Sequence, residues 1–282
     1  MVGQDLHPMR AEHVQRYLER IGASAPVRPT YEALTELTLR HVESVPFENL
    51  SIHLGELSAL DEESLLHKVV DQRRGGVCYE LNGLFAGLLR ALGYEVDLLA
   101  ARAWRGSAYG LTFGHTVLRV HGPAPALVDV GFGNRTVGVV PWEAGVPASG
   151  FGLAPDEHGD VVLRFDGEVL YRMETRPREL ADFVPTWWWF CNSPDSWATN
   201  TMFCIRAVPG GRRMLSAGRL IDVTPNGRTE KLVPADEILD CYRAEFGLHL
   251  PRRPVMRYSD ADSGSAGSRA AAGFLARAAA AP

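Results

Sequence analysis

Residues 74–85 read Arg74-Gly75-Gly76-Val77-Cys78-Tyr79-Glu80-Leu81-Asn82-Gly83-Leu84-Phe85. The paired glycines predict a turn, and the apolar residues that follow recur at helical spacing until Gly93 ends the pattern. We therefore expect Cys78 at the N-terminus of a helix or one turn before it. Unsatisfied N–H groups and the positive end of the helix dipole favour a thiolate there. Cys78 is the first candidate nucleophile; the alternative is a small buried apolar residue.

A cysteine nucleophile works best beside a base that a third group holds in place. His115 begins the β-prone run His-Thr-Val-Leu-Arg-Val, and Asp129 lies in the run Leu-Val-Asp-Val-Gly. Neighbouring strands could place the two side by side, and a carboxylate within an apolar strand is costly unless it is paired. For His115, an ordinary core or surface position is an equal alternative. Cys78, His115 and Asp129 also offer the ligand types of a zinc site, but we expect no metal.

The first 93 residues carry the signals of several helices. Gly22 follows one helical pattern as a C-terminal cap would, Thr30 precedes a second pattern, and Asp61 or Ser58 precedes a third. Together with the helix after Cys78, these patterns predict a helical bundle over residues 1–93.

The pattern changes at Tyr94. Residues 94–185 hold short β-prone runs between turn signals, which predict a small antiparallel barrel or sheet that carries the histidine and the aspartate. Residues 186–258 predict an α/β unit, and residues 259–282 are a low-complexity tail expected to be disordered. The expected fold class is α+β. The α/β unit is expected to contain strands around residues 202–208 and 214–223 and a helix over residues 234–246.

Composition excludes several classes of function. The 282 residues are 46% hydrophobic with a net charge of −5, which is typical of a globular protein and gives no basic footprint for nucleic acid. No apolar run is long enough to cross a membrane, and the N-terminus does not resemble a signal peptide. The 4 cysteines are too dispersed for a disulfide scaffold. We expect a cytoplasmic protein of undetermined oligomeric state.

Four motifs together resemble one known family. They are Arg-Gly-Gly-x-Cys-x-Glu-x-Asn at residues 74–82, Val-Pro-Phe-Glu-Asn-Leu at residues 45–50, Gly-His-Thr-Val-Leu at residues 114–118 and Asp-Val-Gly-Phe-Gly at residues 129–133. In this order they are similar to the arylamine N-acetyltransferase family, which includes the related ansamycin-type amide synthases.

The resemblance implies both a fold and a reaction. The fold is a helical bundle, a β-barrel and a C-terminal α/β lid, of which the first two form a cysteine-protease-like core. The reaction is a ping-pong transfer in which Cys78 takes an acetyl group from acetyl-CoA and passes it to an arylamine or hydrazine. His115 would act as base and then acid, and Asp129 would orient it. Acetyl-CoA is a co-substrate, and no permanently bound cofactor is implied.

The resemblance also assigns residues around the nucleophile. Phe132 would line the acceptor pocket, Phe47 would do so more weakly, and Arg74 and Glu48 would form a structural pair. Val77 and Leu81 depart from residues common in the family, which bears on the shape of the pocket. The aromatic run at residues 186–190 is expected to pack between units; the alternative is a wall for a large flat acceptor.

Three other functions share part of this pattern. An amide synthase would load Cys78 with a polyketide chain from an acyl carrier protein and release or cyclise it onto an aryl amine. A hydrolase of the cysteine-protease or transglutaminase type would share the order of Cys, His and Asp but would not explain the motif at residues 45–50. A pseudoenzyme that only binds an amine or a partner would not need the charged aspartate facing the histidine.

Overall fold

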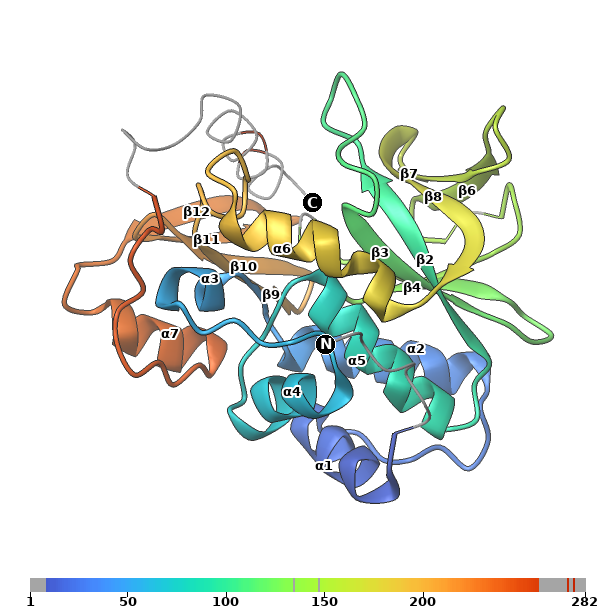
Figure 1. Cartoon of the computed structure of the whole chain (residues 1–282), viewed down its shortest axis with the longest axis horizontal. Coiled ribbons are helices and arrows are strands. Elements are labelled where there is room, and N and C mark those ends of the chain that lie inside the picture. The colour runs from blue at the N-terminus through green and yellow to red at the C-terminus, as the bar shows by residue number, and fades with distance from the viewer. Residues whose placement is uncertain (1–8, 134, 147, 259–272, 274–275, 277–282) are drawn as a thin grey trace.

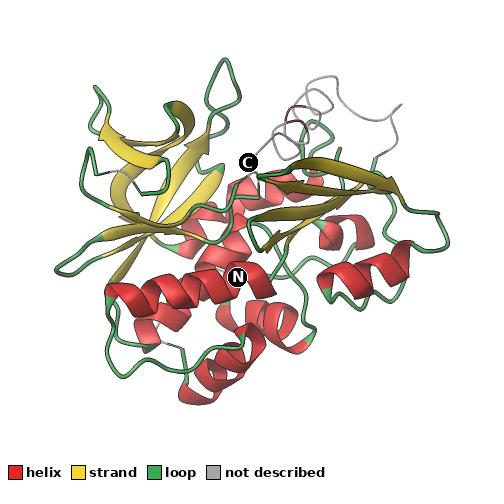
Figure 2. Cartoon of the chain, turned by 180° about the vertical axis from the view of Figure 1, so that it is seen from behind, coloured by secondary structure: helices red, strands yellow, loops and turns green. Residues whose placement is uncertain are grey.

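The structure is a computed structural model that describes residues 9–133, 135–146 and 148–258, together with residues 273 and 276. The tail expected at residues 259–282 lies outside the described residues apart from those two positions. A seven-stranded sheet and a five-stranded sheet lie on opposite sides of the molecule, with helices between and below them (Figure 1). The view from behind shows the same arrangement (Figure 2). The expected α+β class is confirmed.

Two helices of the helical part begin at a side-chain cap. The Thr30 side chain accepts the N–H of Ala33 at 3.2 Å, and Asp61 accepts the N–H of Ser64 at 2.9 Å, so both expected caps are present. The fourth helix continues directly into a π-helical turn at His67–Asp71. The helices are α1 (Ala11–Ile21), α2 (Tyr31–Ser44), α3 (Leu50–Leu54), α4 (Glu62–Leu66) and α5 (Cys78–Ala91).

The larger sheet is a nearly closed barrel. Its strand order is β5-β4-β3-β2-β8-β7-β6, and the edge strands β5 and β6 contact each other. The strands β2 and β3 pack against α5, which joins the barrel to the helical part. Its strands are β2 (Val96–Ala103), β3 (His115–Val120), β4 (Ala126–Asp129), β5 (Gly138–Pro141), β6 (Phe151–Pro155), β7 (Val161–Phe165) and β8 (Glu168–Arg178).

The smaller sheet differs from the expected strand pair. The run expected as one strand over residues 214–223 is two strands, because Ala217 and Gly218 take positive φ angles of 48° and 72° and form a turn. A two-residue strand, β1 (Phe47–Glu48), also joins this sheet by pairing with β9. The other members are β9 (Phe203–Val208), β10 (Gly211–Ser216), β11 (Arg219–Thr224) and β12 (Gly227–Leu232), followed by α7 (Ile238–Phe246).

The main core surrounds α5. Leu81 and Phe85 have no exposed surface, so Leu81 belongs to the core and does not shape a substrate pocket. A 3₁₀ turn at Leu180–Phe183 leads into α6 (Val184–Asn192), which crosses in front of α5 (Figure 1). A Cβ on Gly83 of α5 would lie 3.0 Å from the Leu180 side chain, so glycine permits this close approach.

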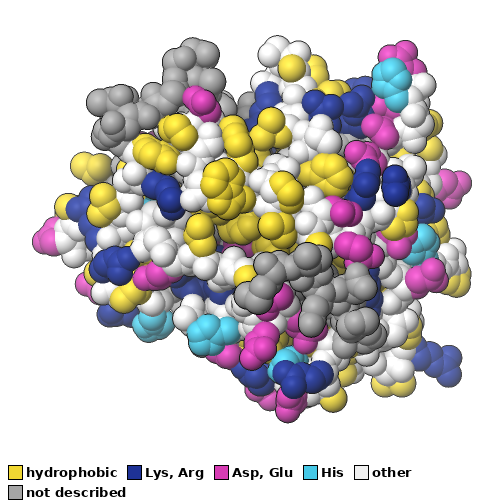
Figure 3. Space-filling view, viewed as in Figure 1, with side chains coloured by type: hydrophobic (Ala, Val, Ile, Leu, Met, Phe, Trp, Pro, Cys, Tyr) yellow, Lys and Arg dark blue, Asp and Glu magenta, His cyan; other side chains and the backbone are white. Residues whose placement is uncertain are grey.

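The aromatic run on α6 has two faces. Trp187 is 8% exposed, and its ring centroid lies 5.9 Å from that of Tyr79 on α5. Trp188 is 64% exposed, and Figure 3 shows apolar side chains gathered on the face of the molecule that carries α6. The inward side of the run therefore packs between elements, as expected, while Trp188 does not.

Candidate active site

Three predicted site residues meet where α5 contacts the barrel. Cys78 is the first residue of α5, His115 is the first residue of β3, and Asp129 is the last residue of β4. β3 and β4 are antiparallel neighbours, so the start of one and the end of the other lie at the same edge. All three residues are buried.

Asp129 holds His115 in place. His115 Nε2 lies 2.8 Å from Asp129 Oδ2, which leaves Nδ1 for the thiol. The other carboxylate oxygen, Oδ1, accepts hydrogen bonds from Asn82 Nδ2 at 3.0 Å and from the Gly131 N–H at 2.9 Å. Asn82 also receives the N–H of Val130 on its Oδ1 at 3.0 Å. The carboxylate therefore cannot rotate without breaking several bonds.

The charge on His115 depends on both of its partners. Burial by itself would lower the pKa of His115, but the negative charges of Asp129 and Cys78, with a hydrogen bond to each, raise this pKa to about 10. His115 is therefore an imidazolium at neutral pH. An imidazole fixed by a carboxylate and hydrogen-bonded to a sulfur is the arrangement of a cysteine nucleophile paired with its base.

The first turn of α5 supplies the backbone N–H groups nearest to Cys78. The N–H groups of Glu80 and Leu81 both bond to the Val77 carbonyl at 3.0 Å, whereas the first N–H groups of a helix have no intrahelical acceptor. Those of Cys78 and Tyr79 belong to this first turn and are available to an oxyanion. Gly131 packs directly against Cys78, because a Cβ on residue 131 would lie only 2.7 Å from Cys78 Cα.

Aromatic rings enclose the histidine. The ring centroid of His115 lies 5.3 Å from that of Phe132 and 5.1 Å from that of Tyr171. Tyr171 is fully buried, and both burial and the neighbouring Asp129 raise the pKa of its hydroxyl well above the ordinary value. Tyr171 therefore stays neutral beside the charged pair.

A small cavity of about 30 Å³ adjoins Asp129. The predicted acceptor residues Phe132 and Phe47 both line it, together with Asp129. The Phe47 ring stacks on Phe203, with centroids 5.3 Å apart and planes inclined by 15°. Gly133 lies against Phe47, since a Cβ at Gly133 would come within 2.1 Å of the ring. Flat apolar rings thus form part of the cavity wall beside the Asp129 carboxylate, together with Arg135 and Arg212.

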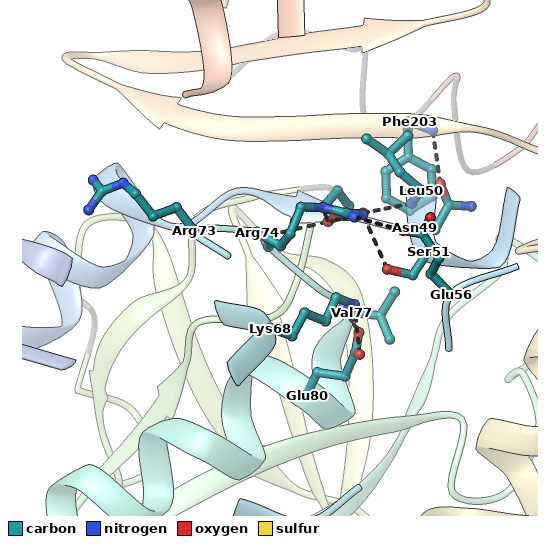
Figure 4. A network of polar contacts seen from close by, with 12 residues as sticks. Asn49, Leu50, Ser51, Glu56, Lys68, Arg73, Arg74, Val77, Glu80 and Phe203 are labelled. Atoms are coloured by element: carbon teal, nitrogen blue, oxygen red, sulfur yellow. Dashed lines mark hydrogen bonds and ion pairs between the residues drawn. The ribbon is translucent and has the colours of Figure 1, made fainter. Parts of the chain in front are cut away.

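A buried polar network anchors the segment before Cys78 (Figure 4). Arg74 pairs with Glu48 at 2.9 Å and donates to the Ser51 hydroxyl at 3.1 Å. Glu48 also accepts the N–H of Leu50 at 2.6 Å. Burial would raise the pKa of Glu48, but Arg74 and then Lys68 outweigh it and hold this pKa below the ordinary value. Glu48 and Arg74 therefore stay charged and fix the turn.

Sequence reasoning missed several residues of the site. Asn82 was within the quoted motif but carried no assigned role, and it proves to bind Asp129. Tyr171 lies in an ordinary β-prone run, and nothing in its local pattern marks it. Lys68 occupies a helical pattern where a lysine is expected on the surface, yet it is 3% exposed and pairs with Glu80 at 2.7 Å.

Comparisons with known proteins agree on one family. A family model described as N-acetyltransferase matches residues 30–255. The arylamine N-acetyltransferase of Mycolicibacterium smegmatis is 35% identical over 83% of this chain and 91% of its own length. The chain belongs to the arylamine N-acetyltransferase family.

Solved structures of arylamine N-acetyltransferases share the fold. The structure from Salmonella typhimurium has a TM-score of 0.80 at 25% identity, covering 95% of this chain and 100% of that chain. The structure of the Mycobacterium marinum arylamine N-acetyltransferase in complex with CoA has a TM-score of 0.75 at 30% identity, covering 93% of this chain and 98% of that chain. The resemblance drawn from the four sequence motifs is confirmed.

Two further findings concern metals and membranes. Within the described ranges, no group of three or more His, Cys, Asp or Glu side chains is arranged to hold a metal ion. In the same part of the chain, no helix is long and apolar enough to cross a membrane.

Proposed function

We propose that this protein transfers an acetyl group from acetyl-CoA to the nitrogen of an arylamine or hydrazine, through an acetyl-cysteine on Cys78. The observation that carries the proposal is the position of His115 between Asp129 and the sulfur of a cysteine at a helix N-terminus. The similarity to arylamine N-acetyltransferases over most of the chain supports it. The assignment of Cys78, His115 and Asp129 as the catalytic triad is part of the proposal.

In the first half-reaction, the Cys78 thiolate attacks the thioester carbon of acetyl-CoA. A carbon–sulfur bond to Cys78 forms, the carbonyl oxygen becomes an oxyanion near the first N–H groups of α5, and the bond to the CoA sulfur breaks. His115 gives its proton to the departing CoA thiolate. Attacking and leaving sulfurs are chemically similar, so this exchange is close to balanced.

Acetylation then prepares His115 for its second role. The thiolate charge is one of the causes that raise the pKa of His115, and acetylation of Cys78 removes that charge. The histidine has also given up its proton, so it is a neutral base facing the acetyl group. An arylamine attacks the acetyl carbon, loses a proton to His115, and releases Cys78 as a thiolate. The resting ion pair is restored.

The phenylalanine rings near Asp129 support an aromatic acceptor. Phe47 and Phe132 present flat apolar surfaces, which suit a ring that arrives neutral, and Asp129 is already bonded to His115. We propose these two phenylalanines as acceptor contacts. Arg74 and Glu48 are proposed to act only by holding the turn before Cys78.

Donor and location are also proposed from the chemistry. Acetyl-CoA is the co-substrate, with no permanently bound cofactor. Because the reaction requires a reduced Cys78, the proposal places the protein in a reducing compartment such as the cytoplasm. The amide synthase alternative uses the same acyl-cysteine with an acyl carrier protein as donor, so the identity of the donor separates the two functions.

The transfer step can be tested by itself. Protein that has been acetylated with acetyl-CoA and freed of excess donor is mixed with an arylamine such as 4-aminobenzoate, and the acetylated amine is measured. We expect one acetyl group transferred per protein and none from Cys78→Ser. An acetylated protein that loses its acetyl group only to water would contradict the proposal and favour a hydrolase. Acylation by a carrier-bound chain but not by acetyl-CoA would favour the amide synthase.

A further inference from the structure

A third buried ion pair lies close to Cys78 and has no part in the mechanism above. Lys68 Nζ lies 2.7 Å from Glu80 Oε1, and the two side chains are 4% and 1% exposed. A buried ion pair is seldom retained for stability alone, because removing two charges from water costs as much as their attraction returns. Stability alone therefore does not explain why this pair lies beside the nucleophile.

The choice of lysine is itself unusual in this chain. Of its 29 basic residues only Lys68 and Lys231 are lysines, and Lys231 is exposed on β12. Lysine offers a compact charge on a slim stem, whereas a guanidinium is broad and planar. A buried position beside one carboxylate oxygen suits the ammonium.

The π-helical turn places Lys68 where it reaches both ends of the segment that carries Cys78. Lys68 belongs to the turn His67–Asp71, and π-helical turns are rare and frequent at functional sites. Its carbonyl accepts the N–H of Arg74 at 3.0 Å, and its ammonium binds Glu80. One residue thus spans the start and the end of the segment 74–80 (Figure 4).

Glu80 in turn caps the helix that begins at Cys78. Its second oxygen, Oε2, accepts the N–H of Val77 at 3.0 Å, so the carboxylate folds back over the first turn of α5. Gly76 makes room for it, because a Cβ there would lie 2.7 Å from the same oxygen. Glu80, which is itself bound by Lys68, therefore fixes Val77, the residue directly before Cys78.

An uncompensated carboxylate at this place would oppose the nucleophile. A negative charge in the first turn of a helix offsets the positive end of the helix dipole, which is the field that favours a thiolate on Cys78. Glu80 and Lys68 act in opposite directions on a neighbouring thiol, that of Cys191. Burial raises the pKa of Cys191, the charge of Glu80 raises it further, and the charge of Lys68 lowers it. Because Lys68 carries the opposite charge, Glu80 can accept the hydrogen bond from Val77 while its negative charge acts less strongly on Cys78.

We propose that Lys68 is a positioning residue for Cys78: it neutralises Glu80 and holds it against the Val77 N–H, so that the nucleophile stays both in place and ionised. The proposal rests on the proposed function, in which the Cys78 thiolate is the nucleophile. It assigns Lys68 no contact with substrate.

The test compares three variants by the rate at which iodoacetamide alkylates Cys78 at neutral pH and by the ultraviolet absorbance of the thiolate. Lys68→Met leaves Glu80 buried and unpaired, and we expect alkylation to slow at least tenfold with loss of the thiolate absorbance. The double variant Lys68→Met/Glu80→Gln keeps an oxygen for the Val77 N–H and removes both charges. We expect it to react within threefold of the wild type. Lys231→Met is the matched control and should react as the wild type does.

Several results would overturn the proposal. A folded Lys68→Met protein that is alkylated within twofold of the wild-type rate would show that Lys68 does not position Cys78. A folded double variant that is alkylated at least tenfold more slowly than the wild type would remove the charge-balance argument, and this comparison with the wild type can be made even if Lys68→Met alone fails to fold. Alkylation does not involve acetyl-CoA, so an absence of acetyl transfer in the wild type would count against the proposed function and not against the role of Lys68.

Discussion

His115 Nε2 and Asp129 Oδ2 lie 2.8 Å apart although the two residues come from different strands, at the beginning of β3 and the end of β4. The pairing of these strands is what turns two isolated residues into one unit. The fixed histidine then faces Cys78, whose position depends on the turn before α5. Each part of this arrangement can be altered separately.

Replacing His115 tests its effect on the nucleophile. His115→Gln keeps a hydrogen-bonding group beside Asp129 but cannot carry a positive charge. We expect alkylation of Cys78 at neutral pH to slow at least tenfold and acetyl transfer to fall by about 10³-fold. His121→Gln is the matched control, because His121 also pairs with an aspartate, Asp97, at 2.7 Å. Unchanged alkylation in His115→Gln would remove His115 from its role.

Gly131 tests the packing of the loop after Asp129 on the nucleophile. A Cβ at this position would lie 2.7 Å from Cys78 Cα and 2.8 Å from Asn82 Nδ2, so Gly131→Ala must displace one of them. We expect kcat/KM to fall about 10- to 100-fold, since small misplacements of reacting groups are costly. Gly152→Ala, where a Cβ meets nothing within 4 Å, should leave kcat/KM unchanged. A Gly131→Ala protein with wild-type kcat/KM would contradict the geometry.

The Arg74–Glu48 pair is expected to govern stability. Arg74→Met leaves the Glu48 carboxylate buried without its main partner, and we expect the free energy of unfolding to fall by about 3–5 kcal/mol. Arg40→Met removes a surface pair with Glu36, whose side chains are 50% and 63% exposed, and should cost less than about 1 kcal/mol. Chemical denaturation of both variants measures the difference. If Arg74→Met and Arg40→Met lost the same free energy of unfolding, burial would not be the reason that the Arg74–Glu48 pair matters for stability.

His41 is expected to weaken the fold in acid. It is fully buried with Nδ1 3.1 Å from the Tyr17 hydroxyl, and burial, followed by the charge of Arg20, lowers its pKa from 6.5 to about 3. The unfolded chain binds this proton below pH 6.5 and the folded chain does not, so stability falls as the pH falls through this range. The loss at pH 5 is about 2 kcal/mol.

Comparing His41→Leu with the wild type isolates this contribution. The variant should lose about 1 kcal/mol at neutral pH, because the Tyr17 hydroxyl loses a partner. Between pH 7 and pH 5, its free energy of unfolding should decline by about 2 kcal/mol less than that of the wild type. His158→Gln, at an exposed histidine, should follow the wild-type curve. Parallel curves for wild type and His41→Leu would show that His41 does not cause the acid loss.

The sequence predicts local features of this fold well because they are set by neighbouring residues. Thr30 caps α2 as predicted, Asp61 rather than the alternative Ser58 caps α4, and the run at residues 115–120 is the strand β3. Cys78 begins α5 because a glycine turn precedes a run of good helix formers. The order of Cys, His and Asp motifs indicates one site, although their distances cannot be read from the chain.

Features that depend on distant partners could not be predicted in the same way. The strand β1 is two residues long, too short for any periodic signal, and exists because β9 pairs with it. The positions of Tyr171 beside His115 and of Lys68 beside Glu80 follow from how whole elements pack. The turn at Ala217 and Gly218 divides a run that reads as one strand, because Ala217 takes a positive φ angle without a strong turn residue before it.

An acetyl group on Cys78 is the direct chemical evidence that this cysteine is the nucleophile. Wild-type protein and Cys78→Ala are incubated with acetyl-CoA in the absence of an acceptor, and the mass of each intact protein is measured. We expect the wild type to gain one acetyl group, located on Cys78, and Cys78→Ala to gain none. A wild-type protein that stays unmodified, or an acetyl group that persists in Cys78→Ala, would contradict it.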